Sequence, residues 1–330
     1  MAPRDGEAGN GEAGVVLLCA LPMGAPTKHH FVPAFHISSW CDANGEVCQM
    51  RMINGKVVPK RKTPGATGFE EQLYRTEGMG PDKEQHLELN FFKPMDSLAA
   101  RALQDMLTGQ PMRWSSEIRS AWTKYLLSLR YRNPETVKDL REHMANVWAT
   151  GRQSIKDDYL NRRLPTDPAT FEEFEALLNP AAAAIGASNL LMRIIDNDRA
   201  GPAIFNMHWS IHHLHHSCFP LVLSDRPFDW PHGLEDPGAF IILPIAPDRV
   251  FLAANSATLR DSKVWKDHTA ATWKLNKAVV SSAREYVWAT DDSQLRFVRK
   301  YFGSAPARKA ISAEQKESSL VAARGQNGVR

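Results

Sequence analysis

The chain has 330 residues, a length that allows one large domain or two of modest size. Hydrophobic residues make up 43% of the chain and charged residues 23%, which is ordinary for a folded protein and excludes a wholly disordered one. Forty Lys and Arg residues against 37 Asp and Glu residues leave a net charge of +3, too even to indicate nucleic acid or a membrane surface as a partner.

The N-terminal segment has two parts. Residues 1–14 are Gly, Ala and charged residues without periodicity, and we predict a disordered arm there. The apolar stretch Val15–Leu21 is too short to span a bilayer, and no basic segment precedes it as in a signal peptide. We therefore expect no membrane segment. Because the four cysteines of the chain do not make a disulfide scaffold, we also expect a cytoplasmic protein.

Residues 35–60 are predicted to form a small β-meander. Asn44-Gly45 and Asn54-Gly55 are strong signals for two-residue turns, and apolar and polar residues alternate between them. A two-residue loop at Asn44-Gly45 would make Cys41 and Cys48 cross-strand neighbours. The pair can be read as a disulfide or as two small buried side chains, and the second interpretation is favoured.

Residues 94–198 are predicted to be a helical layer. Apolar residues from Ile118 to Leu129 recur at intervals of three and four, as they do on one face of a helix. Asn133-Pro134 is typical of an N-cap followed by proline at the first helical position, and Thr170–Glu173 is typical of a capping box. These signals predict several amphipathic helices that share a core.

Strand patterns begin again at Ile204. The predicted elements in this part of the chain are strands at Ile204–His213, Phe219–Leu223, Phe240–Ile245 and Val250–Ala253, and helices near Trp273–Thr290 and from Asp291 to Phe302. The first two strands and the last two strands are each expected to form a hairpin.

The order of these elements predicts an α+β fold. Its mixed or antiparallel sheet is expected to combine N-terminal with C-terminal strands, around the helical middle region. We expect a single domain over residues 15–303, with 94–198 as its helical layer. Residues 304–330 are rich in Ala, Ser, Lys, Glu and Gln without an apolar stripe, and a flexible tail with at most a frayed helix is predicted there.

Two adjacent histidines, His29 and His30, form the first candidate site. Alternation along a strand would point one imidazole inward and the other outward, and an inward imidazole can act as a base or as a metal ligand. The alternative is a histidine whose nitrogens are satisfied by the backbone at a sheet edge, and the residues by themselves favour it.

Ser224-Asp225 and Arg132 are the next candidates. Asp225 follows directly on an apolar strand, so it could present its carboxylate to a histidine, a metal or a substrate hydroxyl, or it could cap its own turn. Arg132 stands where one predicted helix ends and the next begins, and its guanidinium is suited to clamp a carboxylate or a phosphate. The alternative for Arg132, slightly favoured, is a cation that stabilises the C-terminus of a helix.

The segment Met207–Ser217 holds five of the twelve histidines, together with Trp209. The chain has neither an H-E-x-x-H motif nor a cysteine pair with zinc-finger spacing, so a solvated turn is favoured over a metal site, and no metal is predicted. Common nucleotide-binding loops and the serine-hydrolase elbow are also missing from the sequence, which identifies neither a cofactor nor a partner.

Several of these segments resemble the motifs of one known family. The segments are His30-Phe-Val-Pro33 with Phe35, Ile37 and Trp40, then Arg132-Asn-Pro134, then Trp209, Leu223–Phe228 and Ile242–Pro247. They are similar, in consistent order over about residues 28–300, to the H-[YF]-V-P, R-x-P, S-D-x-P and L-P-x-x-P motifs of the domain of unknown function 4238 family. The resemblance implies the fold and the placement of these motifs, and it implies no activity.

The sequence departs from that family pattern at three positions. Leu223 and Arg226 stand where Thr and Asn are frequent, and Ala246 stands where a hydroxyl residue is usual. The loss of these small polar groups weakens a hydrogen-bonding role at the three positions, while Ser224 and Asp225 are retained.

These candidates suggest a hydrolase that acts on an anionic, phosphate-containing substrate. His30 would be the base, Asp225 its orienter or a metal ligand with Ser224 beside it, and Arg132 the anion clamp. Two further residues are candidates for contact with the substrate: His29 and Trp209. The alternative is a non-enzymatic binding or interaction protein, in which the same residues pin the N-terminal strands to the later sheet.

Overall fold

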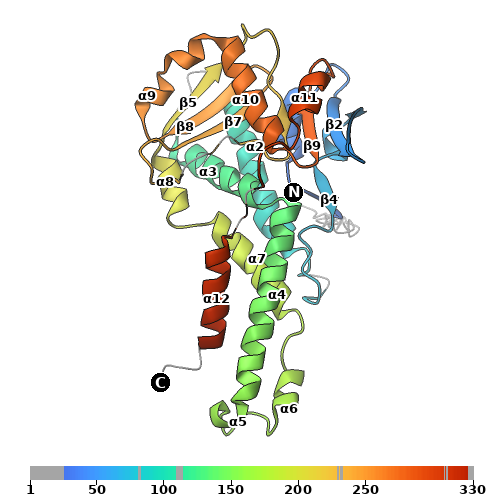
Figure 1. Ribbon diagram of the computed structural model, residues 1–330, viewed down its shortest axis with the longest axis vertical. Helices are drawn as coiled ribbons and strands as arrows, with labels where there is room; N and C mark the ends of the chain where they lie inside the picture. Colours follow the sequence, from blue (N-terminus) through green and yellow to red (C-terminus); the bar gives the residue numbers. More distant parts are fainter. Residues whose placement is uncertain are drawn as a thin grey trace, which may run out of the picture.

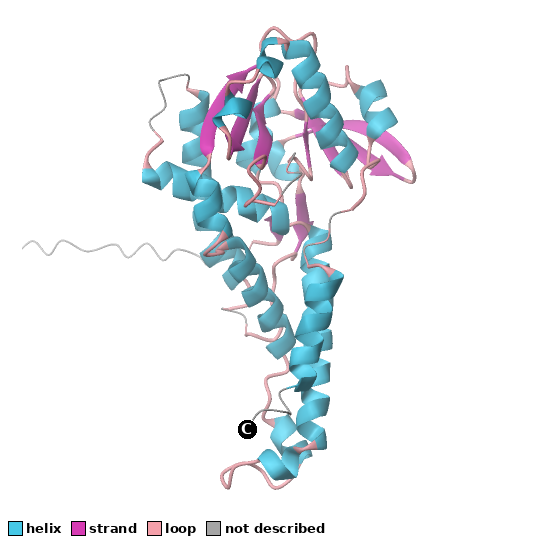
Figure 2. Ribbon diagram, turned by 60° about the vertical axis from the view of Figure 1, so that its left-hand side comes forward, coloured by secondary structure: helices cyan, strands magenta, loops and turns pink. Residues whose placement is uncertain are grey.

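The computed structural model describes residues 26–80, 83–108, 114–228, 230, 233–307, 309 and 311–325. Along its longest axis the molecule has a head, built of antiparallel sheets with helices around them, and a helical arm that extends away from it (Figure 1, Figure 2). The antiparallel sheets and the helical middle region confirm the predicted α+β fold.

The N-terminal part of the head consists of short elements. They are β1 (Lys28–His30), α1 (Ala34–Ile37), β2 (Val47–Ile53), β3 (Lys56–Lys62) and β4 (Phe69–Glu71), with 3-10 turns at Ser38–Trp40 and Pro64–Ala66. The predicted turn at Asn54-Gly55 is confirmed, because it joins β2 to β3 and both residues adopt positive φ, 47° and 77°.

At Asn44-Gly45 the predicted turn forms, with Gly45 at a φ of 73°, but the strand pairing expected across it is wrong. Residues 34–40 are helical, so no strand precedes this turn to pair with β2. Cys48 therefore lies opposite Arg61 on one side and Ala289 on the other, and Cys41 is not its cross-strand neighbour. Both cysteines are free thiols, in agreement with the interpretation as small buried or partly buried side chains.

Strands from the two ends of the chain share one sheet, as predicted. The later strands are β5 (His208–His213), β6 (Leu223–Ser224), β7 (Phe240–Ala246), β8 (Arg249–Ala254) and β9 (Tyr286–Ala289). In the four-stranded sheet, ordered β3-β2-β9-β6, Met50 of β2 lies opposite Val287 of β9. A three-stranded sheet has the order β5-β8-β7, and β1 pairs with β4.

Of the two predicted hairpins in this part of the chain, one is confirmed and one is wrong. The β7–β8 hairpin forms as expected. However, Ile204–His213 and Phe219–Leu223 do not pair with each other, because β5 pairs with β8 and β6 pairs with β9. The backbone groups of both strands are thus satisfied by strands that are distant in sequence, which local patterns do not reveal.

The helical middle region follows the prediction closely. After a short π-helix at Leu87–Phe92 come α2 (Lys93–Leu107), α3 (Ser116–Tyr131), α4 (Pro134–Asp157), α5 (Tyr159–Arg162), α6 (Phe171–Ala176), α7 (Ala182–Ile195) and α8 (Ala200–Asn206). The Asn133 side chain accepts a hydrogen bond from the Thr136 amide, so it caps α4 as predicted. The capping box of Thr170 and Glu173 at the start of α6 is also confirmed.

The C-terminal helices depart from the prediction at two places. They are α9 (Ala257–Arg260), α10 (His268–Ser282), α11 (Leu295–Tyr301) and α12 (Ala313–Gly325). The helix expected over Trp273–Thr290 ends at Ser282, because β9 follows it. The tail predicted to be flexible contains α12, which lies along α4 in the arm (Figure 1). Lys316 of α12 pairs with Asp139 of α4, and the hydroxyl of Ser319, also in α12, lies 3.0 Å from Nε2 of His143. These polar contacts hold the helix in place, and a sequence pattern cannot show them.

One hydrophobic core connects the helical layer with the sheets. Trp122 and Tyr125 of α3 are fully buried, and the Trp122 ring lies 5.8 Å from that of Phe251 on β8. The Trp40 indole donates a hydrogen bond to the Leu221 carbonyl at 2.8 Å. None of the described helices combines the length and the apolar character that crossing a bilayer requires.

Candidate functional site

The two N-terminal histidines differ in their surroundings. His29 is fully buried, its Nδ1 accepts a hydrogen bond from the Tyr74 amide at 2.8 Å, and its Nε2 donates to the Pro26 carbonyl at 3.0 Å. His30 is half-buried, and its Nε2 has no hydrogen-bond partner among the described residues. The inward imidazole is therefore His29, and both of its nitrogens are occupied by the backbone.

Arg132 is fully buried and its guanidinium is bound within the protein. It forms a bidentate ion pair with Asp96 at 2.8 and 3.1 Å, and its Nε donates to the Phe31 carbonyl at 3.1 Å. The Tyr74 hydroxyl donates to the Arg132 carbonyl at 2.6 Å. These contacts tie the residues after β1 to α2 and to the end of α3, as expected of a structural arginine.

Asp225 and Ser224 are buried at the end of β6. The carboxylate of Asp225 accepts hydrogen bonds from the backbone amides of Arg284 and Glu285, at 2.9 and 2.7 Å. The Ser224 hydroxyl donates to the Val279 carbonyl at 3.0 Å. Together they fasten β6 to the end of α10 and to the start of β9.

Trp209 is part of the core. It is 6% exposed, its indole donates to the Ile204 carbonyl at 2.9 Å, and its ring packs edge-on against Phe251 at 5.1 Å. No hydrogen bond or ion pair in the described part of the chain joins His30 to Asp225. The two motifs are linked in another way, since the Arg226 side chain donates to Asn133, the residue after Arg132, at 2.8 Å.

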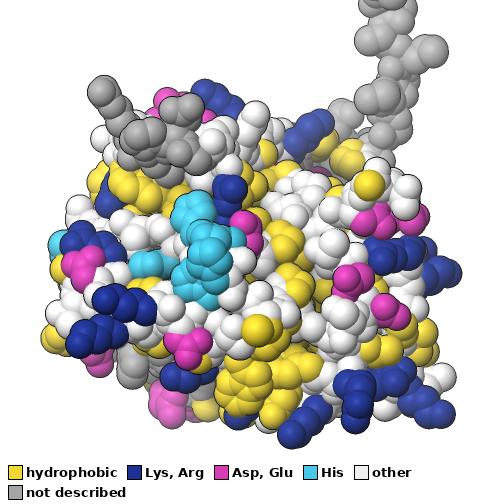
Figure 3. All heavy atoms as spheres, turned by 90° about the horizontal axis from the view of Figure 1, so that it is seen from above, with side chains coloured by type: hydrophobic (Ala, Val, Ile, Leu, Met, Phe, Trp, Pro, Cys, Tyr) yellow, Lys and Arg dark blue, Asp and Glu magenta, His cyan; other side chains and the backbone are white. Residues whose placement is uncertain are grey.

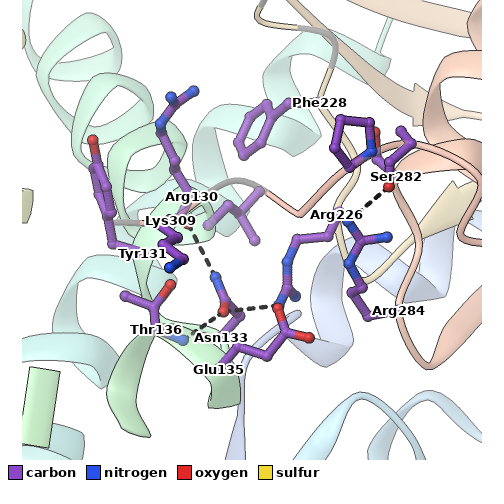
Figure 4. A pocket seen from close by; sticks show the side chains of 13 residues that line it. Arg130, Tyr131, Asn133, Glu135, Thr136, Arg226, Phe228, Ser282, Arg284 and Lys309 are labelled. Carbon is purple, nitrogen blue, oxygen red and sulfur yellow. Dashed lines mark hydrogen bonds and ion pairs between the residues drawn. The ribbon is translucent and has the colours of Figure 1, made fainter. Parts of the chain in front are cut away.

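A basic pocket opens where these two motifs meet (Figure 4). It has a volume of about 160 Å³, and four cationic side chains line it from four separate segments: Arg130 on α3, Arg226 after β6, Arg284 before β9 and Lys309 before α12. Among the described residues of the lining, Glu135 in the first turn of α4 is the one carboxylate. Such a lining creates a positive potential that attracts anions.

Two of the four cations are held by the pocket wall itself. Arg226 donates to the Glu135 carboxylate at 3.0 Å, and Arg284 donates to the carbonyls of Ala283 and Ala305 at 3.2 and 3.0 Å. Arg130 lies with its guanidinium over the Trp230 ring, 4.2 Å from the centroid. The lining also has an apolar part, and its members are Leu129, Tyr131, Phe228, Ala305 and Pro306.

A family model matches residues 28–293, most of the chain, and its family is described as Protein of unknown function (DUF4238). The chain belongs to the DUF4238 family. The resemblance inferred from the H-[YF]-V-P, R-x-P and S-D-x-P motifs is thereby confirmed. No curated protein matches the chain, and no solved structure does. In this DUF4238 member, Ala305, Pro306 and Lys309 of the pocket lie beyond the matched range.

The histidine-rich segment of this DUF4238 protein lies at the outer end of the head. Histidine side chains gather on this face (Figure 3), and the rings of His216 and His268 stack 5.3 Å apart, with His215 at 4.1 Å from His216. His212 stacks instead on Trp265 at 4.1 Å. Within the described ranges, no group of three or more His, Cys, Asp or Glu side chains is arranged to hold a metal ion.

Three titratable groups in and around the first motif, His36 fully buried and His30 and Glu88 half-buried, have shifted pKa values. Burial, with the nearby Arg132 charge, lowers the pKa of His30 to about 4. Burial also lowers the pKa of His36 to about 4, and this side chain donates to the Pro244 carbonyl at 2.9 Å. Glu88 behaves in the opposite way, because burial raises its pKa to about 7 while the Arg132 charge opposes the shift.

These shifts predict that acid weakens the fold. His30 and His36 become protonated near pH 6.5 in the unfolded chain but only near pH 4 in the folded chain. As the pH falls from 6.5 to 4, each histidine therefore lowers the free energy of unfolding by up to about 1.4 kcal/mol per pH unit. Glu88 opposes this trend, because its raised pKa stabilises the fold below about pH 4.5 and the contribution is lost as the pH rises through about 7.

A substitution isolates the contribution of His30. We expect His30→Gln to reduce the loss of unfolding free energy between pH 6.5 and pH 5 by about 1 to 2 kcal/mol, measured by urea unfolding at both values. His208→Gln, at an exposed position of β5, is the matched control and leaves the loss unchanged. An equal loss in the wild-type protein and in His30→Gln would contradict this prediction.

Proposed function

We propose that this protein binds a small anionic molecule in the basic pocket, and that the family motifs form the frame of that pocket. The observation that carries the proposal is the excess of cations over carboxylates among the described residues of the lining, four against one. Among the described residues, Arg130 and Lys309 have no carboxylate partner. An anion that enters the cavity would therefore meet positive charge that the protein does not itself neutralise.

The contacts of the motif residues support their role as a frame. Arg132 uses its guanidinium on Asp96 and on a carbonyl, and both oxygens of Asp225 accept backbone hydrogen bonds. Neither group has a free face for a substrate. This favours the alternative inferred from the sequence, a binding protein whose motifs are structural.

Hydrolysis of a phosphate-containing substrate is the second candidate function. The observation that favours it is His30, whose Nε2 is a buried atom without a hydrogen-bond partner in the described part of the chain. Its pKa of about 4 keeps the imidazole neutral, as a general base must be, at neutral pH. Release of phosphate from a phosphomonoester by the wild-type protein, lost in His30→Gln, would establish this activity.

Titration with inorganic phosphate tests the binding proposal. We expect isothermal titration calorimetry to detect binding to the wild-type protein, and Arg226→Gln or Lys309→Gln to weaken it by about 10- to 100-fold, since a hydrogen bond to a charged group contributes about 1.5 to 3 kcal/mol. Lys56→Gln, at the exposed first residue of β3, is the charge-matched control and leaves the affinity unchanged. Equal affinity in all four proteins would refute the assignment of the pocket.

A further inference from the structure

The directions from which the cations reach the pocket bear on the shape of the anion. Arg130, Arg226, Arg284 and Lys309 reach the pocket from four segments of the chain, and Lys309 lies on the other side of it from Arg226 and Arg284, while the guanidinium of Arg130 points away (Figure 4). The two oxygens of a carboxylate lie in one plane and are satisfied by a single guanidinium. A phosphoryl group has oxygens that point in three directions, so cations that approach from more than one side suit it better.

In the absence of a ligand, the carboxylate of Glu135 pairs with Arg226 in the pocket. Its carboxylate lies 3.0 Å from the Arg226 guanidinium, and its side chain is 57% exposed whereas that of Arg226 is 20% exposed. An ion pair with its carboxylate this exposed contributes little stability. Glu135 therefore occupies the place beside Arg226 that an incoming anion would take.

The apolar part of the lining indicates that the ligand is more than a bare anion. Phe228 and Tyr131 stand on the same side of the pocket as Arg130, above Asn133 and Glu135 (Figure 4). Leu129 and Pro306 add further apolar surface to the lining. An aromatic or aliphatic group packed on it would be removed from water while the phosphoryl group meets the cations.

We propose that the ligand is a phosphate monoester of a small aromatic or apolar molecule, and that its dianion displaces Glu135 from Arg226. The inference rests on the proposed function and deepens it, since it names the class of the ligand. A cavity of about 160 Å³ suits a small molecule better than a phosphorylated protein segment.

Three probes separate the charge of the ligand from its apolar part. Phenyl phosphate at pH 8 is a dianion, because the second pKa of a phosphate monoester is about 6. Phenyl sulfate has the same ring with a single charge, and inorganic phosphate has the dianion without the ring. We expect calorimetry to show phenyl phosphate binding about 10-fold or more tighter than either of the others.

Two variants test the role of Glu135. Glu135→Gln keeps the size of the side chain and removes its charge, and we expect it to bind phenyl phosphate about 2- to 5-fold tighter, the worth of an exposed ion pair. Glu142→Gln, exposed on the same helix and outside the pocket, is the matched control and leaves the affinity unchanged.

Each outcome decides between the two proposals. If inorganic phosphate binds in an Arg226-dependent manner but as tightly as phenyl phosphate, the pocket stands and the ligand class is wrong. The ligand proposal is also wrong, and the pocket stands, if phenyl sulfate binds with the same affinity as phenyl phosphate, or if Glu135→Gln leaves the affinity for phenyl phosphate unchanged. The same conclusion follows if a phosphoserine peptide binds more tightly than phenyl phosphate. If none of the probes binds, the proposed function fails as well.

Discussion

Asp225→Ala will lower the free energy of unfolding by about 2 to 5 kcal/mol. The substitution leaves the backbone amides of Arg284 and Glu285 without an acceptor in a buried place, and each such group costs about 1 to 3 kcal/mol. Asp225→Asn keeps one acceptor oxygen and should lose about half as much. Urea unfolding followed by circular dichroism measures both effects.

The control for this prediction is a nearby exposed aspartate. Asp292→Ala, in the turn before α11, should change the unfolding free energy by no more than about 0.5 kcal/mol. A loss below about 1 kcal/mol for Asp225→Ala would mean that the carboxylate does not hold β9 and the end of α10 as the structure indicates.

Asp96→Ala is expected to cost about 3 to 5 kcal/mol, because it leaves the guanidinium of Arg132 buried without its counter-charge. Removing both charges should be less harmful than the two single effects added together. The double variant Arg132→Met/Asp96→Ala therefore completes a thermodynamic cycle, with urea unfolding as the measurement.

Two results would contradict this account of Arg132. Strict additivity of the two substitutions would show that the ion pair is not coupled. A folded Arg132→Met protein that has lost phosphate binding, although the lining of the basic pocket is intact, would show that Arg132 is the anion clamp and not a part of the frame.

Much of the local structure could be predicted from short-range signals. The turn at Asn54-Gly55, the N-cap at Asn133 and the capping box at Thr170 depend on residues within four positions of one another, so the sequence pattern is sufficient. The same reasoning failed at Asn44-Gly45, where the turn formed but the preceding residues became helical.

Pairings between distant strands could not be predicted in the same way. β6 has two residues and pairs with β9, and Asp225 receives its hydrogen bonds from that partner and from the residues before it. From the sequence, Asp225 could serve a ligand or its own turn. In the structure, the two carboxylate oxygens of Asp225 instead accept hydrogen bonds from the backbone amides of Arg284 and Glu285, about sixty residues later in the chain.

The candidate site was predicted only in part, for the same reason. The motif around Arg132 lies at the junction of α3 and α4, where the pocket is found. However, the cation that lines the pocket at this junction is Arg130. Arg226 appeared in the sequence as a departure from the family pattern, which was a usable signal. Arg284 and Lys309 carry no local pattern, since only the fold brings them to the same cavity.

The most direct test of the central claim is a crystal structure of the protein grown with phenyl phosphate. The account predicts electron density for the phosphoryl group between Arg226 and Lys309, with the Glu135 carboxylate turned away from Arg226. Density for an intact Glu135–Arg226 pair and an empty pocket, at a ligand concentration that saturates the protein in solution, would contradict it.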